Sequence, residues 1–99
     1  MWYAIQSTDH PDSLPLRRQN RAAHLERLEA LRDQGRLLLA GPLPAIDAQD
    51  PGPAGFTGSL EVARFDTLED ARTWADRDPY ASGGVYAKVE IYPFIPVLP

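Results

Sequence analysis

The chain contains no cysteine, and His10 and His24 are its only histidines. Without thiols it forms no disulfide, offers no thiolate nucleophile and cannot hold zinc or an iron–sulfur cluster through sulfur. Two imidazoles are also fewer than most protein-built transition-metal sites use. The sequence therefore predicts neither a metal site nor a cofactor.

Long apolar runs and an excess of basic residues are also missing. Ten Lys and Arg stand against fourteen Asp and Glu, which gives a formal net charge of −4. Because affinity for nucleic acid comes largely from Lys and Arg that neutralise phosphates, nucleic acid is not an expected partner. No apolar run approaches the roughly 20 residues of a membrane-spanning helix, and the N-terminal MWYAIQSTDH does not resemble a signal peptide. We expect a cytoplasmic protein with no membrane partner.

The composition that remains is that of an ordinary globular domain. Apolar residues make up 43% of the chain and charged residues 24%, which is too hydrophobic for a disordered chain of modest net charge. A single core normally serves a chain of this length, and no segment resembles a linker between two cores. We therefore expect one domain that spans residues 1–99.

Hydrophobic periodicity predicts four strands and two helices. The expected strands cover residues 2–7, 36–46, 59–65 and 85–94, and the expected helices cover residues 14–34 and 67–76. Asp12 and Ser13 are capping candidates for the first helix, and Gly35 is placed to end it in a left-handed conformation. Residues 41–58 hold four prolines and four glycines, so most of this segment is expected to be a long connection. The resulting order is βαββαβ.

Two helices of this length can cover only one face of a four-stranded sheet. Apolar side chains are nevertheless expected on both faces, because neighbours in a strand alternate and the strands contain Leu37, Leu38, Leu39, Trp2, Tyr3, Tyr86 and Tyr92. In the last strand, alternation groups Val85, Ala87, Val89 and Ile91 against Tyr86, Lys88, Glu90 and Tyr92. A second copy of the chain is expected to cover the other face, which predicts a homodimer joined sheet to sheet. The C-terminal PFIPVLP is a candidate for reaching across that interface.

The first helix carries a stripe that changes from polar to apolar along its length. Its members fall within about 40° of one line at about 100° per residue. They are Arg17, Arg21, His24, Leu28, Leu31 and Gly35. Because the apolar half must face the sheet, the polar half faces the same side near the rim of the sheet. There the arginines either line a polar hollow or stay solvated, and His24 is either a catalyst or a hydrogen-bonded structural residue.

The segment WADRDPYASGGVY, residues 74–86, places an aspartate, a proline and two glycines between a helix and a strand. Asp78 followed by Pro79 is typical of a helix N-cap with proline at the first helical position. One carboxylate oxygen can cap the backbone while the other orients an imidazole, so Asp78 can serve both as a cap and in a small pocket. Tyr80 belongs either to the core or to that pocket.

Three segments, covering nearly the whole chain in order, resemble the YciI family of small dimeric proteins. They are RAAHLERLEALRDQGRLLLAGPLPA, DPGPAGFTGSL and ADRDPYASGGVYAKVEIYPF. The resemblance implies an α+β, ferredoxin-like domain with an antiparallel four-stranded sheet that pairs into a dimeric α/β barrel. It also implies a site in which His24 meets Asp78, with the Ser59 hydroxyl in the same pocket. The GPLP and ASGG stretches depart from the family pattern and bear on the shape of that pocket.

Three functions remain open for these residues. In the first, His24 oriented by Asp78 is the general base of an enzyme that catalyses elimination, isomerisation or hydrolysis of a small organic anion. The candidates for binding its substrate are Ser59, Arg17, Arg21 and Tyr80. In the second, the same pocket of a dimeric module holds a metabolite without turnover. In the third, His24 and Asp78 form a buried pair that only fixes packing.

Overall fold

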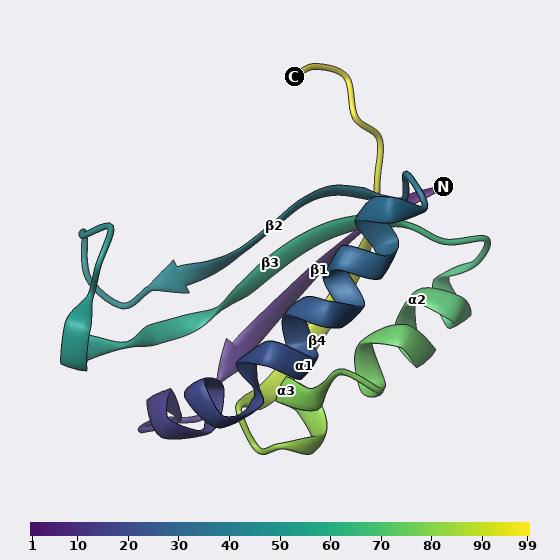
Figure 1. Cartoon of the computed structure of the whole chain (residues 1–99). Helices are drawn as coiled ribbons and strands as arrows, with labels where there is room; N and C mark the ends of the chain where they lie inside the picture. The colour runs from purple at the N-terminus through teal and green to yellow at the C-terminus, as the bar shows by residue number, and fades with distance from the viewer.

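A computed structural model describes all residues, 1–99, and has the expected βαββαβ order with one further short helix (Figure 1). The strands are β1 (Trp2–Asp9), β2 (Leu37–Pro44), β3 (Phe56–Arg64) and β4 (Tyr86–Phe94). The helices are α1 (Leu14–Asp33), α2 (Leu68–Asp76) and α3 (Pro79–Ser82), and a single 3-10 turn covers Gly52–Ala54. None of the helices combines the length and the apolar character needed to cross a membrane.

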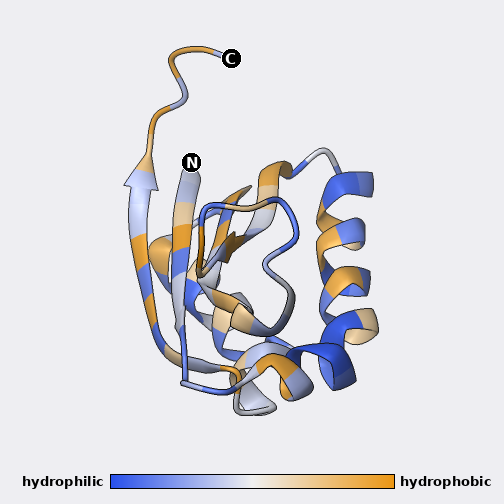
Figure 2. Cartoon of the chain, turned by 90° about the vertical axis from the view of Figure 1, so that its left-hand side faces the viewer, coloured by the Kyte–Doolittle hydropathy of each residue, from blue (hydrophilic) through white to orange (hydrophobic).

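The four strands form one sheet in the order β2-β3-β1-β4, and every neighbouring pair is antiparallel. This is the ferredoxin-like arrangement, so the predicted fold class is confirmed. The helices lie on one face of the sheet, as the side view in Figure 2 shows. In that view the N-terminal half of α1 is coloured mostly hydrophilic, whereas hydrophobic bands appear in its C-terminal half on the side toward the sheet.

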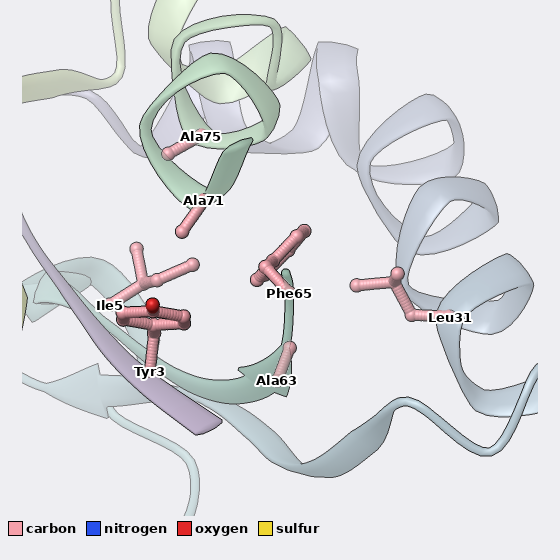
Figure 3. Close-up of a cluster of buried hydrophobic side chains, with 7 residues drawn as sticks. All are labelled: Tyr3, Ile5, Leu31, Ala63, Phe65, Ala71 and Ala75. Carbon is pink, nitrogen blue, oxygen red and sulfur yellow. The ribbon is translucent and has the colours of Figure 1, made fainter. Parts of the chain in front are cut away.

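The core lies between this face of the sheet and the helices. Its main cluster, drawn in Figure 3, consists of Tyr3, Ile5, Leu31, Ala63, Phe65, Ala71 and Ala75. Alternation in β1 selects Tyr3, Ile5 and Ser7 for burial, and the antiparallel register sets them opposite Ala63, Glu61 and Ser59 of β3. The helix-facing side of β3 is therefore polar at Ser59 and Glu61, toward the start of the strand, and apolar at Ala63, toward its end.

The other face of the sheet has no covering layer within one chain. A row of paired residues crosses it from edge to edge, namely Leu39, Val62, Ala4 and Tyr92. Leu39 and Tyr92 are 47% and 50% exposed, and Phe94, opposite Trp2, is also exposed.

The segment between β2 and β3 is shorter than expected. Residues 41–44 belong to β2 and residues 56–58 to β3, so the connection proper is residues 45–55. Pro42 and Pro44 are compatible with a strand here because β2 is an edge strand, where a residue without an N–H group is tolerated. The expected connection thus accounts for most of residues 41–58, but its two ends are strand, because proline content does not exclude an edge strand. The other edge strand, β4, contains Pro93.

Two local expectations for the helix ends and β4 also need correction. Ser13 is the N-cap residue of α1, but its side chain makes no capping bond and instead donates a 3.4 Å hydrogen bond to the Asp9 carboxylate. A register shift between Thr8 and Asp9 places Tyr86 opposite Asp9 and among the buried residues, although simple alternation grouped it with Lys88. Such a bulge adds one residue to a strand and moves the side chains beyond it to the other face.

Candidate functional site

The polar half of α1 lines a cleft of about 540 Å³. The opposite walls come from β2 and from residues 50–52 of the connection, and the floor comes from Phe56, Ser59 and Glu61 of β3. The floor is polar because the helix-facing positions of β3 carry a serine and a glutamate at this end of the strand. The volume lies within the range of about 300–1,000 Å³ that is usual for small-molecule sites.

His24 lines this cleft and contacts Asp78, which is not among the lining residues. The Nδ1 atom of His24 lies 2.8 Å and 3.0 Å from the two carboxylate oxygens of Asp78, and both residues are buried. Asp78 is positioned by its role as N-cap of α3, since its Oδ1 atom accepts a 2.9 Å hydrogen bond from the Tyr80 N–H. When Asp78 is ionised, the proton of this pair sits on Nδ1, which leaves the Nε2 lone pair available.

The ring of Tyr80 fixes the plane of the imidazole. It stacks on His24 with 3.9 Å between ring centroids and 9° between ring planes. Tyr80 is itself held by an edge-to-face contact with Tyr86, at 5.6 Å between centroids. Burial raises the pKa of Tyr80, so its hydroxyl keeps its proton at neutral pH. Tyr80 therefore belongs both to a core cluster and to the lining of the cleft.

Arg17 lies in the cleft wall, and its Nε and Nη2 donors are bonded to protein groups. Its guanidinium donates to the Asp9 carboxylate at 2.6 Å and 3.0 Å, to the Gly58 carbonyl at 2.8 Å and to the Ser59 hydroxyl oxygen at 2.9 Å. Burial opposes its positive charge, yet the hydrogen bond and charge of Asp9 outweigh it and raise the pKa of Arg17. Asp9 was not singled out from the sequence, where the only signal was an acid at the end of the first strand.

The remaining predicted binding residues, Ser59 and Arg21, differ in how many of their hydrogen-bonding groups are already used within the chain. Ser59 is buried at the cleft floor, where its hydroxyl accepts from Arg17 and retains its own proton to donate. Arg21 lines the cleft, is exposed and forms no ion pair or side-chain hydrogen bond with the rest of the chain. Arg21 is thus the predicted arginine whose guanidinium remains available to a ligand.

Glu61 is a residue of the cleft that sequence reasoning missed. Its Oε1 atom lies 3.8 Å from Nε2 of His24 and has no hydrogen-bond partner, and the residue is only 3% exposed. Burial, and to a smaller extent the charge of Asp78, raise the pKa of Glu61, while Arg27 and Arg17 lower it. The net result is a pKa of about 8. The alternation of β3, which groups Glu61 with Ser59 and Ala63, is the signal that could have found it.

His24, Glu61 and Asp78 also form the one cluster whose spacing could suit a metal ion, with donor atoms within 4.8 Å of one another. Asp78 already accepts a hydrogen bond from Nδ1 of His24, so the unpaired donors are Nε2 and the Glu61 carboxyl. Structural and catalytic zinc sites use three or four protein ligands. The cluster fits proton transfer better than metal binding.

The chain is similar in sequence to two bacterial proteins and similar in fold to a solved bacterial enzyme. It is 55% identical to Protein YciI of Escherichia coli over 95% of this chain and 96% of that one, and 49% identical to an uncharacterised protein of Haemophilus influenzae over the same shares. Its fold is similar to that of TftG, the 5-chloro-2-hydroxyhydroquinone dehydrochlorinase of Burkholderia phenoliruptrix, in its complex with 2,5-dihydroxybenzoquinone. That likeness has a TM-score of 0.84 at 25% identity and covers 96% of this chain and 94% of the other.

The sequence pattern of one family covers almost the entire chain. The YCII-related domain matches residues 1–95, which takes in all four strands and all three helices of the fold. The resemblance stated from the sequence is thereby confirmed, and the chain belongs to the YCII-related domain family.

Proposed function

We propose that the protein is a small-molecule enzyme in which His24, oriented by Asp78, acts as a general base on a small organic anion. The observation that carries the proposal is the 2.8 Å contact between Asp78 and Nδ1 of His24, a residue that lines a cleft of about 540 Å³. A carboxylate on one ring nitrogen fixes the tautomer and increases the basicity of the other nitrogen. General-base catalysis of this kind contributes roughly 10²- to 10⁴-fold to a rate.

The neighbouring side chains have complementary tasks in this mechanism. Arg21 attracts the anionic group of the substrate, because its guanidinium is unpaired in the chain and lines the cleft. Ser59 donates a hydrogen bond to a substrate oxygen, while Arg17 holds the Ser59 hydroxyl at 2.9 Å. Arg17 is therefore a positioning residue rather than a direct ligand of the substrate. Tyr80, stacked on His24, keeps Nε2 directed away from Asp78.

Elimination is the reaction that the similarity to TftG favours. TftG is a dehydrochlorinase of a chlorinated, hydroxylated aromatic ring and was solved with a dihydroxybenzoquinone. In such a step here, His24 would take a proton from the substrate, the released electron pair would form a new π bond, and the leaving group would depart as an anion. The proposed substrate class is therefore a small hydroxylated aromatic or related anion that carries a leaving group.

Chloride release from 5-chloro-2-hydroxyhydroquinone tests the base directly. We expect His24→Gln to lower kcat/KM by about 10²- to 10⁴-fold, because glutamine fills similar space but accepts no proton. The matched control is His10→Gln, since His10 is an exposed imidazole outside the cleft. Asp78→Asn should preserve the N-cap of α3 while losing the charge beside Nδ1, and it should lower kcat more than it raises KM.

Three outcomes would contradict the enzyme hypothesis in different ways. Unchanged turnover in His24→Gln would remove His24 as the base. Tight binding of 2,5-dihydroxybenzoquinone by the wild type, with no chloride release, would favour the alternative of a non-catalytic metabolite-binding module. A large loss of thermal stability in His24→Gln, with neither binding nor turnover in the wild type, would favour the packing role.

We also propose that two copies pair through the uncovered face of the sheet to form a homodimer. The apolar row that includes Leu39 and Tyr92 supports this, because exposed apolar patches of this kind commonly mark subunit interfaces. Sedimentation equilibrium should give twice the chain mass for the wild type and for Leu68→Lys, a control at a leucine that is 49% exposed on α2. Leu39→Lys should give the mass of one chain, and a wild type of one-chain mass would contradict the proposal.

A further inference from the structure

Glu61 has no task in the mechanism proposed above, yet it is the buried acid nearest to the reactive nitrogen. Its Oε1 atom is 3.8 Å from Nε2 of His24, which is too far for a hydrogen bond and leaves room for substrate atoms to meet both groups. The carboxyl is 3% exposed, lines the cleft and has an oxygen without a hydrogen-bond partner. A buried polar group left unpaired costs stability, so its retention at a ligand-sized cavity points to a ligand.

The groups around Glu61 favour its protonated form. From α1, His24 faces it and Arg27 and Arg17 act on it through their charges. Asp78, at the start of α3, contributes a negative charge, and Tyr86 of β4 contributes a neutral phenol whose own pKa is raised by burial. Burial is the largest cause of the rise in the pKa of Glu61 to about 8, and the two arginines do not reverse it. At neutral pH the cleft therefore contains a carboxylic acid beside the imidazole of His24.

We propose that Glu61 is a second proton-transfer residue, which donates its proton to a substrate oxygen while Nε2 of His24 removes a proton from the adjacent carbon, so that the cleft accepts small enolisable carbonyl anions. This inference rests on the proposed base role of His24 and adds an acid and a substrate class to it. Arg21, free at the cleft wall, is available to the anionic group.

The step balances within the cleft. The substrate C–H bond breaks and its proton goes to Nε2, while its electron pair forms a carbon–carbon double bond. The π pair of the carbonyl moves to oxygen, which takes the proton of Glu61, and the product is the neutral enol. His24 is then an imidazolium between the carboxylates of Asp78 and Glu61, 3.8 Å from the latter. After the enol leaves, a solvent water that accepts the Nε2 proton and gives one to Glu61 restores the starting state.

Exchange of α-protons in deuterated water, followed by proton NMR, tests the proposal with pyruvate, 2-oxobutyrate and phenylpyruvate as probes. The wild type should accelerate exchange of at least one probe over solution. Glu61→Gln keeps a hydrogen-bond donor but cannot release a proton, so it should lower kcat at least 10-fold with little change in KM; Glu61→Leu should lower kcat further. The control Glu26→Gln alters an exposed acid of α1 outside the cleft and should match the wild type.

The pH profile separates an acid from a packing residue. Wild-type kcat/KM should fall as pH rises through about 8, where Glu61 loses its proton, and this fall should be absent in Glu61→Gln. Wild-type rates and an unchanged profile in both Glu61 variants would overturn the acid role and leave His24 as the base. Failure of the wild type to exchange any probe would overturn the inference, while chloride release would still decide the proposed function.

Thermal unfolding gives a readout that needs no substrate. The folded chain holds the Glu61 proton up to a pKa of about 8, whereas the unfolded chain releases it near the ordinary value of 4.5. The wild-type Tm should therefore decline between about pH 5 and about pH 8, and Glu61→Gln, which has no such proton, should decline less. Parallel Tm curves for the two proteins over this window would show that the carboxyl does not hold its proton and would overturn the acid role.

Discussion

Replacing Arg17 with methionine should destabilise the fold by about 3–5 kcal/mol, the usual cost of removing one partner from a buried ion pair. Its side chain and that of Asp9 are 7% and 2% exposed, and they are joined at 2.6 Å. Without the guanidinium, the Asp9 carboxylate stays buried with only the long contact to Ser13, and the Gly58 carbonyl loses its 2.8 Å donor. Urea or thermal unfolding at fixed chain concentration measures the loss.

The neighbouring arginine provides the control for this change. Arg18 is exposed, so Arg18→Met should alter the free energy of unfolding by no more than about 0.5 kcal/mol. Arg17→Lys keeps the charge but loses the bidentate geometry of the guanidinium. Its loss in free energy of unfolding should therefore fall between those of Arg17→Met and Arg18→Met. If Arg17→Met and Arg18→Met unfold alike, the Asp9–Arg17 pair does not stabilise the floor of the cleft.

Replacing Gly58 with alanine should cost about 3 kcal/mol or more, at or above the upper end of the usual range for over-packing. A Cβ atom at this position would lie 1.8 Å from the Ser7 carbonyl oxygen, in the backbone of the neighbouring central strand β1. Because the obstacle is backbone rather than a flexible side chain, β1 and β3 would have to separate. The same movement would shift the Gly58 carbonyl and Ser59, which Arg17 contacts.

Gly41→Ala is the matched control, since an added Cβ in β2 would meet nothing within 4 Å in the chain. Denaturant unfolding of the two variants should therefore differ by at least about 2 kcal/mol. Near-equal stabilities would mean that the sheet accommodates a methyl group at position 58 without moving.

The inward direction of His24 and the capping role of Asp78 each had a local signal, but their meeting was implied only by the resemblance to the YciI family. The helical spacing of the α1 stripe directed His24 inward, and the Asp-Pro pair marked Asp78 as a cap whose second oxygen was free. The structure adds 2.8 Å between Nδ1 and the carboxylate, across 54 residues of sequence. Local rules could not supply this pairing, because His24 lies in the middle of α1 and Asp78 caps α3, and neither pattern identifies a distant partner.

The fate of Arg17 and Tyr86 could not be predicted from the same rules. The position of Tyr86 depends on the bulge between Thr8 and Asp9, which moves it to the buried side, whereas Arg17 depends on its pairing with Asp9 at the end of β1. A bulge changes which residue faces which across two strands, and periodicity within one strand does not reveal it. Glu61, by contrast, lay on the buried side by simple alternation and was overlooked because an acid in a strand is usually solvated.

The prolines of the two outer strands have a consequence for the behaviour of the protein at high concentration. Pro42 and Pro44 in β2 and Pro93 in β4 each remove a backbone donor from an edge onto which another chain could add a strand. Exposed Leu38 and Leu39 make the β2 edge hydrophobic and therefore prone to association. The N–H groups that the prolines lack nevertheless interrupt any continuous ladder of backbone hydrogen bonds along this edge. Fibrillar, amyloid-like growth is thereby hindered, although the sheet leaves one apolar face open.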